Sequence, residues 1–132
     1  MFGLDTNVLV RPLTQDDPRQ SRIASSLLAD LAERGETIFL SGIVLCELCW
    51  VLRSAYEYEK NAISEVLEKI LDTPQLSVED RDLVRQALSD YRDGKGDFSD
   101  YLLARRAEQA GATLTYSFDR KLKGARLFKV LG

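Results

Sequence analysis

The sequence predicts an α/β protein in which helices cover both faces of a parallel sheet. Short apolar or β-prone segments alternate with segments of helical period along the whole chain, which is the pattern of strands joined by crossover helices. The chain has 132 residues, 45% of them hydrophobic, which suits one compact domain with its own core. No internal repeat or linker-like segment divides it, so we expect residues 1–132 to form a single domain.

In the first part of the chain, apolar spacing and stop signals predict three strands and four helices. A short apolar run over residues 2–4 ends at Asp5-Thr6-Asn7, whose side chains are typical helix caps, so a helix is expected over 8–13. The next helix keeps its period over 23–31 and stops at Gly35. The further expectations are a β-prone strand over 37–40, a helix around Glu47, a helix over 63–71 that ends near Pro74, and a short strand over 75–78.

In the last third of the chain, two helices come before two strands. The first helix is expected over 83–91 and stops in the loop 93–96, where two glycines occur. The second is expected over 98–110, with Gly111 as its C-cap. Strands follow over 113–116 and 127–131, which brings the predicted sheet to about five strands.

Glu47 is the most unusual residue of the sequence, because it stands alone in an apolar run that extends from Ile43 to Leu52. A carboxylate is almost never buried unless a cation, a metal or strong donors replace its water. Two interpretations follow. Either one edge of the helix is exposed and Glu47 reaches it, or Glu47 lines a polar pocket together with other acids.

The composition excludes several kinds of active site. The chain has no histidine, which removes serine–histidine and cysteine–histidine nucleophilic catalysis and the usual general base near neutral pH. Cys46 and Cys49 are the only cysteines, and one C-x-x-C pair cannot complete a zinc site. Their position inside the apolar run favours core thiols over a redox pair. An enzyme of this composition would depend on carboxylates and a hard cation.

The charge is unevenly distributed along the chain. The formal net charge is −3, yet residues 100–132 carry seven basic and three acidic side chains. Such a basic segment could contact phosphates, or it could be a solvated surface. No apolar stretch is long enough to span a membrane, and the first residues lack a secretory signal, so a cytoplasmic location is expected.

Five acids lie where the predicted topology would bring them to one edge of the sheet, beyond the carboxyl ends of the strands, where ligands of open α/β sheets bind. Asp5 ends the first strand, and Glu47 lies in the helix after the second. Asp119 follows a late strand, and Asp97 and Asp100 begin the helix that leads to it. Each acid alone could be a helix cap or a turn residue. Together they would repel one another unless a cation neutralised them.

An oxygen-rich site without histidine suits Mg²⁺ or Mn²⁺, which bind carboxylates and water in octahedral geometry. A metal held in this way supports in-line displacement at phosphorus. The reaction indicated by these residues is metal-assisted hydrolysis of a phosphodiester.

Four segments of the chain form an ordered set of motifs: residues 4–11 (LDTNVLVR), 44–52 (VLCELCWVL), 97–104 (DFSDYLLA) and 117–120 (SFDR). This set resembles the successive motifs of PIN-domain ribonucleases, and more narrowly those of the toxins of bacterial VapBC type II toxin–antitoxin systems. The resemblance covers the whole chain. It implies a single PIN domain with a three-layer α/β/α fold around a parallel sheet of about five strands.

The resemblance also implies a metal-dependent endoribonuclease that uses Mg²⁺, with Mn²⁺ as a possible substitute. The positions that match the acidic quartet of the family are Asp5, Glu47, Asp100 and Asp119, while Asp97 matches a frequent extra acid and Asn7 and Ser117 match supporting polar positions. Family members usually form homodimers and are inhibited by a small cognate antitoxin. The basic residues that flank the acids, and are therefore expected to contact RNA phosphates, are Arg105, Arg106, Arg120 and Lys121.

Two other functions fit parts of the sequence. A phosphatase with an aspartate nucleophile would present a second acid two residues after Asp5, where this chain has Asn7. A non-catalytic PIN-like module that binds RNA or protein would typically have lost one or more of the acids, whereas this chain keeps all of them. The nuclease is therefore the preferred interpretation.

Overall fold

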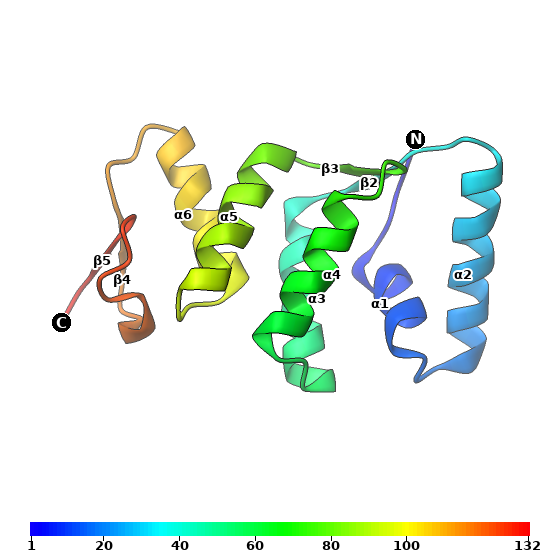
Figure 1. The fold of residues 1–132 in the computed structure, drawn as a ribbon, viewed down its shortest axis with the longest axis horizontal. Coiled ribbons are helices and arrows are strands. Elements are labelled where there is room, and N and C mark those ends of the chain that lie inside the picture. The colour runs from blue at the N-terminus through cyan, green and yellow to red at the C-terminus, as the bar shows by residue number, and fades with distance from the viewer. The chain divides into compact units, whose positions relative to one another are not determined.

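The computed structural model describes residues 1–132, and the chain divides into two compact units, Met1–Glu79 and Asp80–Gly132 (Figure 1). The first unit holds β1 to β3 and α1 to α4, and the second holds α5, α6, β4 and β5.

The first unit is built on a three-stranded parallel sheet of order β1-β2-β3. Its elements are β1 (Phe2–Gly3), α1 (Thr6–Thr14), α2 (Pro18–Glu33), β2 (Ile38–Leu40), α3 (Gly42–Tyr56), α4 (Lys60–Leu71) and β3 (Leu76–Val78). The register pairs Phe2 with Ile38 and Ile38 with Leu76. Because all three strands run in the same direction, their carboxyl ends share one edge of the sheet.

Helix packing supplies the core of the first unit. Helix α1 packs against α2 and α3, and α4 packs against α3 and β3. The buried side chains are mostly leucine and isoleucine, among them Leu40, Leu45, Leu48, Leu52, Ile63 and Leu67. Burying one such side chain stabilises the fold by about 1.5–3 kcal/mol, so this core holds the strand ends in fixed positions.

The second unit pairs two helices with a two-stranded parallel sheet. Its elements are α5 (Arg81–Asp93), α6 (Phe98–Gln109), β4 (Thr115–Ser117), the 3₁₀ turn η1 (Arg120–Leu122) and β5 (Phe128–Val130). Helices α5 and α6 lie side by side (Figure 1). The rings of Tyr91 and Phe98 meet edge to face between them, with centroids 6.2 Å apart.

The loop between α5 and α6 is held tightly against Tyr101. A Cβ atom at Gly94 would collide with the Tyr101 hydroxyl, so this position requires glycine. The backbone N–H of Gly96 donates a hydrogen bond of 2.9 Å to the same hydroxyl. At Gly96 a Cβ atom would lie 2.5 Å from the side chain of Leu122, which is fully buried. These contacts bring the start of α6 close to η1.

The structure confirms the alternation of strands and helices and the parallel pairing of the strands. All the predicted elements form, although the five strands occur as one sheet of three and one sheet of two. Helix α2 begins earlier than expected, at Pro18, and β4 begins later, at Thr115. No helix combines the length and the apolar character that a membrane span requires. That residues 1–132 act as a single domain stays a prediction.

Candidate acidic site

Asp5 lies at the carboxyl end of β1 and caps α1, as its sequence context predicts. Its backbone is extended, and its Oδ1 atom accepts a hydrogen bond of 2.8 Å from the N–H of Thr6. The rest of the side chain is exposed, as is Asn7 in the first turn of the helix. The carboxylate of Asp5 therefore faces outward from the edge of the sheet where the strands end.

Glu47 projects from the exposed face of α3. It shares this face with Ile43, which is 73% exposed, and Trp50, which is 70% exposed, while Val44 and Leu48 on the other side are buried. Within the first unit, then, Glu47 lies on an exposed helix edge, which is the simpler of the two interpretations above. The helix begins after β2 with Ser41 as its N-cap, so Glu47 lies about 9 Å along α3 from the strand ends.

Glu79 is a carboxylate that the sequence analysis missed. It follows β3 at the same edge of the sheet, and its Oε1 atom accepts a hydrogen bond of 2.9 Å from the N–H of Gly42 at the start of α3. A carboxylate in this position complements the partial positive charge of a helix N-terminus. Only the parallel order of β2 and β3 brings these two residues together, so no local sequence signal would have found the contact.

Asp97 and Asp100 begin α6 and form a capping box. Asp97 is the N-cap residue, and its backbone N–H donates a hydrogen bond of 2.8 Å to Oδ2 of Asp100. Asp100 is half-buried below the loop that contains Gly96. The backbone thus fixes the spacing of these two carboxylates.

Asp119 joins them from the turn after β4. Its Oδ1 atom accepts a hydrogen bond of 3.0 Å from the N–H of Lys121, the middle residue of the η1 turn. The hydroxyl oxygen of Ser117, the last residue of β4, accepts a hydrogen bond of 3.0 Å from the N–H of Asp119. Ser117 therefore orients the turn that carries Asp119, as a supporting polar residue would.

The ammonium group of Lys121 lies between two of these acids. Its Nζ atom is 3.8 Å from Oδ2 of Asp97 and 3.8 Å from Oδ2 of Asp119. The three side chains are between one third and one half exposed, so water screens these ion pairs. One positive charge, that of Lys121, therefore already lies beside Asp97 and Asp119.

Asp100 carries the electrostatic effect of this crowding. Burial raises the pKa of Asp100 above its ordinary value, and the charges of Asp97 and Asp119 raise it further. The hydrogen bond from the Asp97 N–H and the charge of Lys121 oppose this shift without cancelling it. A cation near Asp100 would favour its ionised form.

The residues of this cluster suit a hard divalent cation. All the donor atoms are carboxylate oxygens, which Mg²⁺ and Mn²⁺ prefer, and the cluster already holds the cationic group of Lys121. The three carboxylates of the second unit are not arranged as a ready-made set of ligands. Their side chains would have to turn inward for two or more of them to bind one ion.

The four basic candidates differ in how far they are engaged. Arg105 is 17% exposed and makes two hydrogen bonds to Asp90, of 2.7 Å and 2.9 Å, which raise its pKa. Arg106 lies 3.6 Å from a carboxylate oxygen of Asp80. Arg120 is exposed. Arg105 therefore ties α6 to α5, and Arg120 is better placed for a phosphate.

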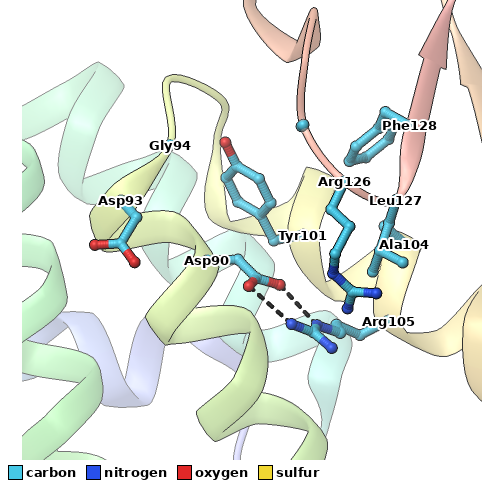
Figure 2. A pocket seen from close by; sticks show the side chains of 10 residues that line it. Asp90, Asp93, Gly94, Tyr101, Ala104, Arg105, Arg126, Leu127 and Phe128 are labelled. Atoms are coloured by element: carbon cyan, nitrogen blue, oxygen red, sulfur yellow. Dashed lines mark hydrogen bonds and ion pairs between the residues drawn. The ribbon is translucent and has the colours of Figure 1, made fainter.

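Figure 2 shows a pocket beside this tie, in the second unit, with a volume of about 220 Å³. The Asp90–Arg105 pair and the rings of Tyr101 and Phe128 form part of its lining, and the Arg126 side chain extends beside Arg105. None of the five candidate acids lines this pocket. It is therefore a feature separate from the acidic cluster, and the sequence analysis did not anticipate it.

The structure thus brings together Asp97, Asp100 and Asp119, with Ser117 and Lys121 beside them, in the second unit. It places Asp5, Asn7 and Glu47 in the first unit, the first two at the carboxyl end of β1. That all five acids act on one ligand stays a prediction.

Comparison with known proteins identifies the family. Residues 3–126 match the model of the PIN domain. The chain is also 32% identical over 120 residues to a VapC ribonuclease of Aquifex aeolicus (strain VF5), an alignment that covers 91% of this chain and 88% of that protein. The order of strands, helices and acids described above agrees with this match, and the chain belongs to the PIN-domain family.

Proposed function

We propose that this protein is a metal-dependent endoribonuclease and the toxin of a type II toxin–antitoxin pair. One observation supports this most strongly: a chain similar over nearly its whole length to a VapC ribonuclease gathers three carboxylates around a single cationic group. Such a cluster is costly in a purely structural role, because like charges destabilise the fold. It is useful if a cation binds there.

The proposed catalytic residues are the acids at the motif positions, namely Asp5, Glu47, Asp100 and Asp119, with Asp97 as a further metal ligand. Asp100 supplies a half-buried carboxylate whose pKa is raised by burial and by the neighbouring charges of Asp97 and Asp119. Ser117 orients Asp119 by accepting a hydrogen bond from its backbone N–H. In the first unit, Asn7 is proposed to support Asp5.

The proposed cofactor is Mg²⁺, with Mn²⁺ able to replace it, since nucleases of this family generally use divalent metals. When bound, such an ion polarises a phosphoryl oxygen, lowers the pKa of a bound water and stabilises the leaving oxygen. The carboxylates of the proposed site would hold the ion and would orient a water by hydrogen bonding. With no histidine in the chain, a carboxylate is the available group for moving a proton near neutral pH.

The proposed substrate is RNA, which the basic residues of the second unit would guide by its phosphates. Arg120, Arg106 and Lys121 are the main candidates, because the guanidinium of Arg105 is already bonded to Asp90. The acids alone would repel a phosphate, so these charges must offset that repulsion near the site.

The proposed protein partner is a small antitoxin, as expected for a toxin of this type, and we also propose a homodimer. The cytoplasm is the expected location, since RNA is the substrate.

A cleavage assay tests the function directly. Purified protein is incubated with a panel of structured RNAs in Mg²⁺, in Mn²⁺ and in chelator, beside the Asp100→Asn variant. We expect cleavage by the wild-type protein in the metals alone, and none by the variant. RNA binding without cleavage in any metal would instead favour the non-catalytic PIN-like module.

A further inference from the structure

We propose that Lys121 is a built-in counterion of the acidic cluster, which holds the carboxylates of Asp97 and Asp119 in the metal-free protein and is displaced when the divalent cation binds. This inference rests on the proposed function, since it assigns to Lys121 a role at the metal site. It differs from the role of a simple phosphate contact, because it predicts that Lys121 opposes metal binding.

The geometry carries the inference. The Nζ atom of Lys121 is equidistant, at 3.8 Å, from one oxygen of Asp97 and one of Asp119, although these acids come from different elements, the N-terminus of α6 and the turn after β4. A single ammonium group thus bridges the two carboxylates that flank Asp100. A divalent cation that binds these oxygens must occupy the same region.

The backbone of Lys121 is fixed, whereas its side chain is free to move away. Its N–H donates a hydrogen bond to Oδ1 of Asp119, and the neighbouring Leu122 is fully buried. The Lys121 side chain itself is 48% exposed and ends in two solvent-screened ion pairs. Such pairs are weak, so a divalent ion with stronger carboxylate bonds can replace the ammonium group without disturbing the turn.

The charge balance of the cluster also supports exchange of one cation for another. The three carboxylates of Asp97, Asp100 and Asp119 lie beside one ammonium group, whose Nζ atom pairs with two of them. Lys121 therefore compensates the cluster only in part. A divalent ion supplies twice the charge, and the displaced ammonium group then lies beside the site, where it can meet a substrate phosphate.

The test compares Mn²⁺ binding to the full-length chain and to two charge-matched variants by isothermal titration calorimetry. Lys121→Gln removes the counterion, and Lys123→Gln removes the same charge from an exposed residue just after the turn. We expect Lys121→Gln to bind Mn²⁺ about two- to fivefold tighter than the wild type, the range set by weak exposed ion pairs. Lys123→Gln should stay within about twofold, since the charge of an exposed, solvent-screened side chain contributes little.

Melting temperatures in chelator and in saturating Mn²⁺ give a second readout that needs no cleavage. In chelator, Lys121→Gln should melt below Lys123→Gln, because its carboxylates have lost their counterion. In saturating Mn²⁺ this difference should disappear, so that Mn²⁺ raises the melting temperature of Lys121→Gln the most. Lys121→Arg keeps the charge and should bind Mn²⁺ no tighter than the wild type.

The possible results separate this inference from the proposed function. If the wild type binds Mn²⁺ and Lys121→Gln binds it no tighter than Lys123→Gln, Lys121 is not a competing counterion and the inference is wrong. If the wild type binds no Mn²⁺ at all, the metal site of the proposed function fails, and the inference fails with it.

Discussion

The acids of the two units are held in different ways. In the first unit, Asp5 is exposed and bonded to a backbone N–H, and Glu47 lies on an exposed helix face. In the second unit, Asp97, Asp100 and Asp119 are close enough that burial and mutual repulsion raise the pKa of Asp100, and a lysine compensates them in part. The second unit therefore stores electrostatic strain at Asp100. We expect metal-free stability to respond to acids of the second unit, and cleavage to need acids of both.

The largest expected effect is the loss of cleavage in Asp5→Asn and in Asp100→Asn. Each change removes one proposed anionic ligand and keeps the shape of the side chain, and we expect cleavage rates to fall at least about a hundredfold, the usual scale for a charge-stabilising group. The measurement is the single-turnover rate on one RNA in Mg²⁺. Asp30→Asn, which alters an exposed aspartate of α2, is the control and should cleave at the wild-type rate. A normal rate for Asp5→Asn alone would confine catalysis to the second unit.

Substitutions of one glycine from each unit should change the free energy of unfolding by different amounts, because the two glycines are packed differently. Gly94→Ala would place its Cβ against the rigid Tyr101 ring, and overpacking of this kind costs about 1–3 kcal/mol of unfolding free energy. Gly3→Ala, in β1, meets no atom within 4 Å and should change stability by less than about 0.5 kcal/mol. Denaturant unfolding measures both changes. Equal effects would show that the loop against Tyr101 is not the rigid support that we describe.

The arginines of the second unit should divide into a structural group and a binding group. Arg105→Ala breaks two charge-assisted hydrogen bonds to Asp90 and should lower the unfolding free energy by about 1–2 kcal/mol. Arg120→Ala should leave stability unchanged and should flatten the log–log dependence of RNA affinity on salt by roughly 0.7. If Arg105→Ala instead flattened the slope and left stability intact, our assignment of these residues would be reversed.

A smaller effect concerns the pH dependence of stability in chelator. Because the pKa of Asp100 is raised in the folded protein, folding favours its protonated form. The stability due to that proton is present below the unfolded value of about 3.8 and is lost as the pH rises through the folded pKa. Asp100→Asn cannot ionise, so it should melt about 1–4 °C above the wild type at neutral pH. This gap should close as the pH falls below 3.8; a gap of the opposite sign would contradict the strain that we assign to the second unit.

Much of the fold was predictable from local sequence signals. Asp5 is the N-cap that its position after an apolar run predicts, and Gly35 and Gly111 follow their helices with positive φ angles of 68° and 104°. The η1 turn was missed, because it depends on a hydrogen bond that the backbone N–H of Lys121 donates to the side chain of Asp119. A turn of three residues leaves no periodic pattern to detect.

The motifs of the sequence name candidate acids, whose roles stay predictions, but they do not reveal the interactions that hold these acids. The motifs named the acids, yet the ion pairs of Lys121 depend on how α6 and the turn after β4 pack together. The helical period could not decide the exposure of Glu47, because Ile43 and Trp50 are apolar and still lie on the exposed face. Which side of a uniformly apolar helix faces outward depends on its neighbours and not on its own sequence.

The central claim is that a divalent cation binds to the proposed acidic residues, and its most direct measurement is the shift of melting temperature caused by Mn²⁺. The wild type is compared with the single variants Asp5→Asn and Asp100→Asn, and with a quintuple variant. The quintuple variant lacks the carboxylates of all five candidate acids, namely Asp5, Glu47, Asp97, Asp100 and Asp119. We predict that Mn²⁺ raises the melting temperature of the wild type, raises that of each single variant less, and leaves the quintuple variant unchanged. A wild-type shift in the quintuple variant would contradict a metal site built from these acids, and a full shift in Asp5→Asn would contradict the proposed role of Asp5 in it.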